Sequence, residues 1–332
     1  MLDLPRLQGI RLSAKPRFQR IVGAALLMPN YNLPPRVRIE FENDARVPAE
    51  PVLFAMNHTD RYNYWPFQYK LWRSHQRYTA TWVKGKYYEN TLLGKFMELA
   101  NNIPTVSRGY IITRDFLSTL QRRPGDEEYR TTREWIDAVA AGGKDSAPPA
   151  DVPDELLTHP RDVLGMRFEP ANESYAAFID RLFHAMMNRF VELHREAFDL
   201  GLDLIIFPQG TRSIRLSRGH IGLAEIALAF RRTIVPVGSN NCDQVYPGGS
   251  PVARGGTVTY RFGEPIPYNE MKPFHVHEQF TPFTNEAEQA HRERFQGLVD
   301  LVMDRINGLL DPRHQRDDSD ESGGVRGSSR FV

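Results

Sequence analysis

A single cysteine, a net charge close to zero and the lack of a metal-binding cluster limit what this chain of 332 residues can be. Cys242 has no partner for a disulfide within the chain and predicts a reducing compartment. The net charge of +1 gives no general attraction to nucleic acid, so no nucleic-acid partner is expected. The ten histidines form no Cys/His cluster, and no metal is expected.

The chain also lacks a long apolar run. The best stretch, Ile21 to Met28, ends at Pro29 and falls short of the ~20 residues that span a bilayer. Basic residues dominate the sequence ahead of it. This pattern predicts that residues 1–34 form an amphipathic helical segment lying in the headgroup region of a membrane. An N-terminal helix that packs on the core with its basic side chains in water fits the pattern equally well.

Buried strands alternate with helices between residues 35 and 312. The expected strands are 37–41, 51–56, 78–83, 103–106, 202–207, 233–238 and 257–262, and the expected helices between them include 64–73, 92–99 and 221–230. This alternation predicts an α/β fold, with a mostly parallel central sheet flanked by helices.

Polar residues follow several of these strands at their carboxyl ends, where ligands bind in parallel sheets. His58 follows 51–56 and precedes a helix, whose N-terminus favours a neutral ring that accepts protons. Gln209 follows 202–207, and next to it Gly210 permits close approach of the backbone to a ligand. Thr211 adds a hydroxyl, and Arg212 suits the oxygens of a phosphate. By itself, the histidine is better explained as an ordinary polar residue at a strand end, and the short segment is a weak motif that also fits an ordinary turn.

Taken together, Asn57-His58-Thr59-Asp60-Arg61-Tyr62-Asn63 and Phe207-Pro208-Gln209-Gly210-Thr211-Arg212-Ser213 resemble the first and third blocks of the glycerolipid (lysophosphatidic acid) acyltransferase family. Segments 218–224, 234–237 and 262–266 resemble later parts of the family in the same order. The resemblance implies fatty acyl transfer from acyl-CoA or acyl carrier protein to a hydroxyl of a phosphorylated glycerolipid acceptor, such as a lysophospholipid. It further implies no cofactor, His58 as the general base and a cytoplasmic protein at the inner face of the membrane.

The same resemblance implies that Arg108, Gln209, Gly210, Thr211 and Arg212 bind the acceptor. Lys84 matches a family lysine, although a solvated side chain is the simpler interpretation. Against the family pattern, residues 111–201 form a long insertion, and helical periodicity over 127–141 and 175–200 predicts that it is mainly helical. A lid, a partner site and a wall for the acyl chain all fit it. Residues 313–332 are charged and rich in Gly and Ser, which predicts disorder.

Two residues depart from the family. Asn63 stands where the family has Asp, and Gln209 stands where it has Glu. Asn63 can accept a hydrogen bond from His58 but brings no charge, and the matching change in a Ser-His-Asp triad costs roughly 10⁴ in rate. Papain-like enzymes nevertheless use an Asn partner. Asp60 either substitutes for the missing carboxylate or caps the following helix.

These departures leave a second hypothesis open: a catalytically silent relative that binds lipid phosphate or acts as a scaffold. Serine-hydrolase chemistry is a weaker alternative, because the sequence has no Gly-x-Ser-x-Gly motif.

Overall fold

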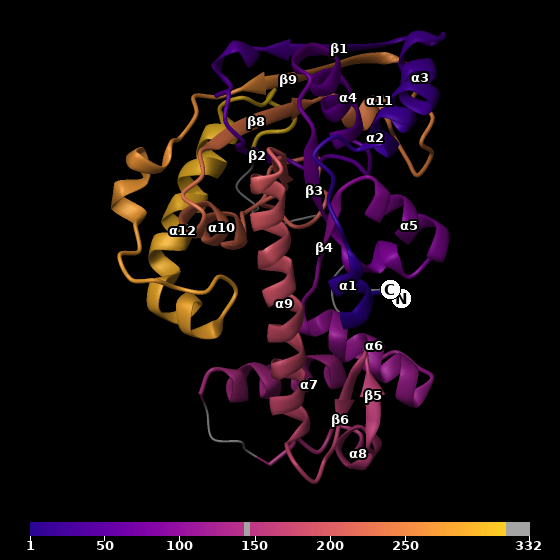
Figure 1. The fold of residues 1–332 in the computed structure, drawn as a ribbon, viewed down its shortest axis with the longest axis vertical. Coiled ribbons are helices and arrows are strands. Elements are labelled where there is room, and N and C mark those ends of the chain that lie inside the picture. Colours follow the sequence, from indigo (N-terminus) through magenta and orange to yellow (C-terminus); the bar gives the residue numbers. More distant parts are fainter. Residues whose placement is uncertain (143–146, 317–332) are drawn as a thin grey trace.

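The computed structural model describes residues 1–142 and 147–316, which are built around a seven-stranded sheet (Figure 1). The strand order is β1-β9-β8-β2-β7-β3-β4. The strands are β1 (Val37–Glu42), β2 (Leu53–Met56), β3 (Thr79–Lys84), β4 (Asn102–Thr105), β7 (Asp203–Ile206), β8 (Ile234–Asn240) and β9 (Gly256–Phe262). From β8 to β4 neighbouring strands run parallel, whereas β9 is antiparallel to β8 and parallel to β1. The predicted α/β fold with a mostly parallel sheet is confirmed.

Side chains of successive strand residues point to opposite faces of the sheet. In β2, Leu53 and Ala55 belong to one buried apolar cluster, while Phe54 and Met56 belong to another. The first face packs against α9 (Tyr175–Asp199), α10 (Gly222–Ala229) and α12 (Asn285–Asn307), and the second against α3 (Met28–Asn32), α4 (Tyr64–His75) and α11 (Cys242–Val245). The central strands are therefore covered on both faces, as their continuous apolar runs predict.

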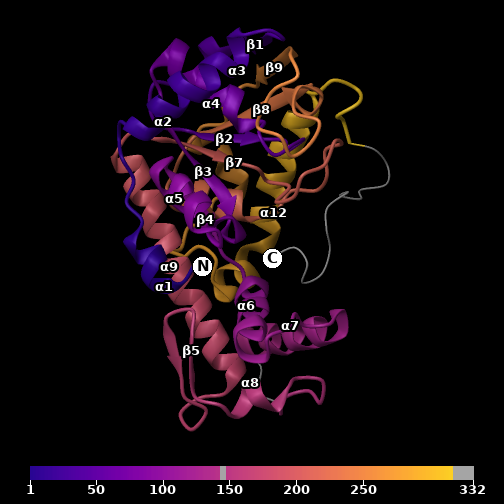
Figure 2. The ribbon, with the colours of Figure 1, turned by 90° about the vertical axis from the view of Figure 1, so that its right-hand side faces the viewer.

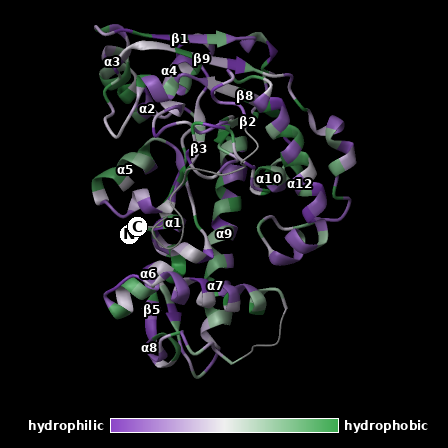
Figure 3. Ribbon diagram, turned by 180° about the vertical axis from the view of Figure 1, so that it is seen from behind, coloured by the Kyte–Doolittle hydropathy of each residue, from purple (hydrophilic) through white to green (hydrophobic). Residues whose placement is uncertain are grey.

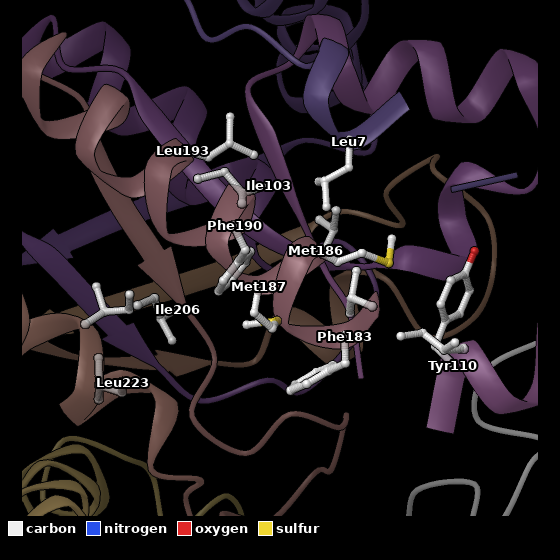
Figure 4. Close-up of a cluster of buried hydrophobic side chains, with 14 of the residues drawn as sticks. Leu7, Ile103, Tyr110, Phe183, Met186, Met187, Phe190, Leu193, Ile206 and Leu223 are labelled. Carbon is white, nitrogen blue, oxygen red and sulfur yellow. The ribbon is translucent and has the colours of Figure 1, made fainter. Parts of the chain in front are cut away.

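The 25-residue helix α9 is the main support of the larger cluster. Figure 4 shows Phe183, Met187 and Phe190 of α9 among residues of the sheet and of the N-terminal segment. Hydrophobic residues recur along α9 and in the central strands (Figure 3). Helix α9 therefore packs against both the sheet and the N-terminal segment of the chain.

Residues 108–142 and 147–174, together with the first part of α9, extend beyond one end of the sheet (Figures 1 and 2). They comprise α6 (Arg108–Leu120), α7 (Asp126–Ala140), α8 (Asp154–Thr158), a hairpin of β5 (Arg161–Val163) and β6 (Met166–Phe168), and α9. The first helix begins at Arg108, three residues before the insertion expected from the sequence. Inside this region Asp115 accepts hydrogen bonds from Arg161 at 2.6 Å and from the Tyr175 hydroxyl at 2.8 Å. A buried ion pair thus joins α6, the hairpin and α9.

The N-terminal residues pack on the body of the protein. Helix α1 (Leu4–Gly9) buries Leu4 and Leu7 in the larger cluster beside α9. The apolar helix does not end at Pro29: α2 (Arg17–Val22) continues through a π-helical turn, η1 (Gly23–Leu27), into α3. The wider turn directly precedes the proline, whose missing N–H removes one bond of the regular helix.

No helix in the two described ranges is long and apolar enough to cross a membrane. At the other end of the chain, residues 313–316 of the predicted disordered tail lie within the described part. There His314 is fully buried and bonded to Ile214 O at 2.8 Å. Residues 317–332 lie outside it. The remaining elements are α5 (Thr91–Leu99) and the 3₁₀ turns η2 (Asp44–Arg46), η3 (Gly85–Tyr88) and η4 (Tyr268–Phe274).

Candidate functional site

The candidate site lies just beyond the carboxyl end of β2, where Asn57 fixes the chain. Its side chain accepts a hydrogen bond from Ser239 N at 2.7 Å and donates one to Ser239 O at 2.9 Å. Through this pair of hydrogen bonds to β8, the Asn57 side chain extends the sheet one residue beyond the end of β2. His58 is consequently presented at the edge of the sheet from a rigid support.

The segment after β7 holds the backbone of His58. The His58 N–H donates to Gln209 Oε1 at 2.9 Å, and the His58 carbonyl accepts from Ser213 N at 2.8 Å. Phe207 stacks on the imidazole, with ring centroids 4.2 Å apart and planes inclined by 19°. The two segments that carry the family resemblance therefore meet at one residue, although His58 and Gln209 are 151 positions apart.

Asn63 orients the imidazole ring. Its Oδ1 lies 3.0 Å from His58 Nδ1, and its Nδ2 donates to Asn57 O at 2.8 Å. Because Nδ2 must face that carbonyl, Oδ1 is the atom presented to the ring, and it can only accept. In the neutral imidazole the proton therefore resides on Nδ1, which leaves the Nε2 lone pair as the basic atom.

The surroundings of His58 favour this neutral form. Burial lowers the pKa of His58 to about 3, the hydrogen bond with Asn63 acts in the opposite direction, and the charges of Arg212 and Lys84 lower it further. At neutral pH the ring is unprotonated and able to accept a proton. An anion bound to Arg212 would offset its charge and strengthen the base.

Asp60 is occupied by its own loop. Its Oδ1 accepts from Tyr62 N at 2.8 Å, and its Oδ2 accepts from the Thr59 hydroxyl at 2.9 Å. Helix α4 begins at Tyr64, and its N-cap position is Asn63, whose side chain makes no capping hydrogen bond, so the expected helix-cap role of Asp60 is wrong. The carboxylate instead closes a short turn between His58 and the helix. Burial raises the pKa of Asp60 to about 6.

The side-chain amide of Gln209, like that of Asn63, accepts a hydrogen bond through its oxygen and donates through its nitrogen. Besides accepting from His58 N, it donates through Nε2 to Ser217 Oγ at 3.1 Å and to Arg215 O at 3.4 Å. A carboxylate in its place would keep the accepted bond and face the Arg215 carbonyl with a second acceptor. The two departures from the family pattern thus share one physical reason: each amide lies between an N–H group and a carbonyl oxygen.

The next residues, Gly210 to Arg212, form a turn after β7. Gly210 has a φ of 64°, and a Cβ there would lie 2.9 Å from the His220 ring, so a side chain would be strained. Thr211 is buried, whereas Arg212 is exposed. The charge of Arg212 lowers the pKa of His58, so this exposed cation lies in the neighbourhood of the imidazole.

Arg108 is engaged elsewhere. It is buried at the first position of α6, where Nε donates to Asp180 of α9 at 3.0 Å and the guanidinium lies 4.2 Å from the Phe183 ring centroid. Asp137 adds a second carboxylate at 3.7 Å. Phosphate binding by Arg108 would require that these pairs open, and it stays a prediction. The pairing has no signal in the sequence, because Asp180 lies in the insertion.

A narrow cleft lies along α4, between this helix and the N-terminal segment. Most of its aromatic lining comes from α4, and its aliphatic and polar lining comes from α4 and from other segments. The lining includes Tyr64, Trp65, Tyr69, Trp72, Tyr78, Phe96, Val22, Leu27, Gln19, Gln68 and Asn102. Tyr64 also contacts Phe207, at 6.4 Å between ring centroids, and Phe207 in turn stacks on His58. The cleft therefore begins one side chain away from the imidazole.

Lys84 ends β3 and acts electrostatically on His58, so the interpretation as an ordinary solvated lysine misses its position. Sequence reasoning also missed Phe207 and Ser213 as partners of His58. Both lie inside the resembling segment, which was the available signal. In the described ranges, no group of three or more His, Cys, Asp or Glu side chains is arranged to hold a metal ion.

Comparison with known proteins adds little to this geometry. No family model matches the sequence, and no curated protein is similar to it in sequence. One solved structure that resembles it is the 1-acyl-sn-glycerophosphate (LPA) acyltransferase PlsC from Thermotoga maritima. The TM-score is 0.37 and the identity 13%, over 89% of this chain and 79% of that chain. A likeness at this TM-score carries no argument, so the fold rests on the strand order and the site on its contacts.

Proposed function

We propose that the protein transfers a fatty acyl group from a thioester donor, acyl-CoA or acyl carrier protein, to a hydroxyl of a phosphorylated glycerolipid acceptor. The observation that carries this proposal is the attachment of His58 to the 207–213 segment by two backbone hydrogen bonds. These bonds put an unprotonated Nε2 beside a loop with an exposed arginine, which is the pairing that a phosphorylated alcohol requires.

The reaction would use His58 as both base and acid. Nε2 takes the proton of the acceptor hydroxyl as its oxygen attacks the thioester carbonyl, and a C–O bond forms. The tetrahedral intermediate then collapses, the C–S bond breaks, and the imidazolium returns the proton to the leaving thiolate. Asn63 holds Nδ1–H throughout. Arg212 binds the acceptor phosphate and Thr211 adds a hydroxyl, while Gln209 and Gly210 shape the loop that positions them.

The acyl chain would occupy the cleft along α4. Its aromatic and aliphatic side chains offer an apolar surface beside the polar Gln19, Gln68 and Asn102, and the contact from Tyr64 through Phe207 to His58 connects this surface to the reacting atoms. Apolar lining of this kind is what a hydrocarbon chain needs to leave water.

A membrane surface at the inner face is the proposed source of the acceptor. The α2–η1–α3 segment exposes Ile21 to 60%, together with Leu26 and Met28, and Leu33 directly after α3 is 63% exposed. Basic side chains lie near the start of the segment, and this combination suits an anionic lipid surface. Loss of sedimentation with anionic vesicles in Ile21→Asp/Leu33→Asp would support the assignment, while unchanged sedimentation would contradict it.

The test of the reaction is a mass-resolved acyl-transfer assay over a panel of lysophospholipid and glycolipid acceptors. Wild type should form an acylated product, His58→Ala should form none above background, and the matched control His277→Ala, at an exposed histidine, should behave as wild type. No product with any acceptor, and equal results for wild type and His58→Ala, would refute the proposal.

A second candidate, lipid-phosphate binding without turnover, is favoured by one observation. Asn63 is neutral, so the imidazolium formed during catalysis has no carboxylate beside it. Retained binding of lysophospholipid by wild type, with no turnover on any acceptor, would select this alternative.

A further inference from the structure

The surroundings of His58 at the edge of the sheet carry more positive charge than one acceptor phosphate needs. Arg61 follows β2, Arg212 follows β7, Lys86 lies in η3 directly after β3, and Arg123 follows α6, the helix after β4. Since β2, β7, β3 and β4 are consecutive in the sheet, their carboxyl ends lie side by side at one edge. Loops far apart in the sequence therefore bring Arg61, Arg212 and Lys86 to this edge, and Arg123, beyond the far end of α6, joins them through its effect on Lys86.

These side chains are close enough to act on one another. After burial, which is the largest cause, the charges of Arg212, Arg61 and Arg123 each lower the pKa of Lys86. Three cations thus converge on a fourth within a small region, and like charges at that range repel.

Carboxylates do not relieve this repulsion. Among the described residues, no carboxylate forms an ion pair with Arg61, Lys86 or Arg123. Other arginines of the protein do have such partners: Arg77 pairs with Asp203, and Arg161 pairs with Asp115. A group of mutually repelling cations without carboxylate partners, beside a candidate catalytic residue, is the arrangement that a bound polyanion stabilises.

The amount and spacing of the charge decide between ligands. A phosphate monoester carries about −1.5 to −2 charges and is matched by Arg212 with one neighbour. The remaining cations call for further phosphate groups, and their convergence on Lys86 fits a compact polyphosphate better than the long acidic helix of a carrier protein.

On the basis of the proposed acyl transfer, we propose that Arg61, Lys86 and Arg123 bind the phosphates of a coenzyme A thioester, the acyl donor. Coenzyme A carries a pyrophosphate and a 3′-phosphate, so it offers several anionic groups on one small molecule. Arg212 is then left to the phosphate of the acceptor, and the donor and acceptor reach His58 from adjacent loops.

Calorimetric titration with coenzyme A itself tests this site without any turnover. Lys86→Ala/Arg123→Ala should weaken binding about tenfold or more, since hydrogen bonds to charged groups are lost. Dephospho-coenzyme A, which lacks the 3′-phosphate, should bind wild type more weakly and lose less in the variant. The control Arg130→Ala/Lys272→Ala removes two exposed cations elsewhere and should bind as wild type.

Equal affinity of wild type and Lys86→Ala/Arg123→Ala for coenzyme A would overturn the proposal, as would an equal loss in the control. His58→Ala separates this inference from the proposed reaction. Coenzyme A binding that persists in His58→Ala and depends on Lys86, without acyl transfer by wild type, would leave the site standing and refute the reaction. Acyl transfer from carrier protein alone, with no coenzyme A binding, would do the reverse.

Discussion

Replacement of Asn63 by Asp, the residue of the resembling family, should harm this protein rather than improve it. Asn63 is fully buried, and its Nδ2 donates to Asn57 O at 2.8 Å while its Oδ1 faces His58 Nδ1 at 3.0 Å. A carboxylate preserves the contact with the ring. It cannot donate to Asn57, so two acceptor oxygens are pressed together in a buried place.

The cost follows from the lost donor. A buried carbonyl without its hydrogen bond costs about 1–3 kcal/mol. The new carboxyl would reduce this cost by keeping a proton, which raises its pKa above the ordinary value of about 3.9. The folded variant then binds more protons than the unfolded chain, so its free energy of unfolding falls as pH rises above about 4. A protonated Asp brings no negative charge to the imidazolium, and the rate should not exceed that of wild type.

Urea unfolding and acyl transfer at about pH 5 and pH 8 measure both effects. The control is Asn90→Asp, because Asn90 is exposed and caps α5 by accepting from Leu93 N at 2.9 Å, a role that Asp fills equally well. The variant should be less stable than wild type by about 1–3 kcal/mol at pH 8 and by less at pH 5. A variant as stable as wild type at pH 8 and at least tenfold faster would refute the reasoning.

Three further predictions concern the protonation of His58, the side-chain amide of Gln209 and the protonation of Glu225. Because burial lowers the pKa of His58 to about 3, kcat/KM should stay level from about pH 8 down to about pH 5; an acid limb near 6.5 would contradict this. Gln209→Glu should lower kcat/KM about tenfold by turning an acceptor toward Arg215 O and shifting the loop, and steady-state kinetics unchanged from wild type would count against it. Burial raises the pKa of Glu225 to about 8, and its Oε2 has no hydrogen-bond partner among the described residues. The folded state therefore keeps a proton that the unfolded chain releases near 4.3, and wild type loses stability as pH rises between these values. Glu225→Gln should consequently raise the free energy of unfolding at about pH 8 by about 1–3 kcal/mol, and a lower value there would contradict the assignment.

The buried strands of the fold were predictable from the sequence, because parallel strands covered on both faces are continuous apolar runs. The stretches expected at 51–56, 202–207 and 233–238 correspond to β2, β7 and β8. The direction of β9 was not predictable, since the same apolar pattern serves a parallel or an antiparallel partner and only the tertiary pairing with β8 decides it.

Helix α12 went unnoticed because its first half is almost entirely polar. Its buried face lies mostly in the second half, where Phe295, Leu298, Val299 and Val302 recur at helical spacing. The β5–β6 hairpin was also missed, because strands of three residues are too short to show alternation. Its turn at Leu164 and Gly165 has positive φ at both positions, which glycine alone signals in the sequence.

For the site, the sequence placed His58 and Gln209 at the same edge of the sheet, where the structure joins them. The direction of their bond was not predictable: Gln209 holds the backbone of His58 rather than its ring. Asp60 and Arg108 show a second limit. Their neighbours Tyr62 and Asp180 decide what each side chain binds, and those contacts depend on loop geometry and on the packing of the insertion.

Acyl transfer by His58→Gln tests the central claim most directly. Glutamine keeps a side chain beside Asn63 and Phe207 but cannot carry a proton between acceptor and thiolate. With an acceptor that wild type uses, kcat/KM should fall by about 10² to 10⁴, while urea unfolding and lysophospholipid binding stay close to wild type. A rate for His58→Gln within a few-fold of wild type would contradict the claim that His58 is the base.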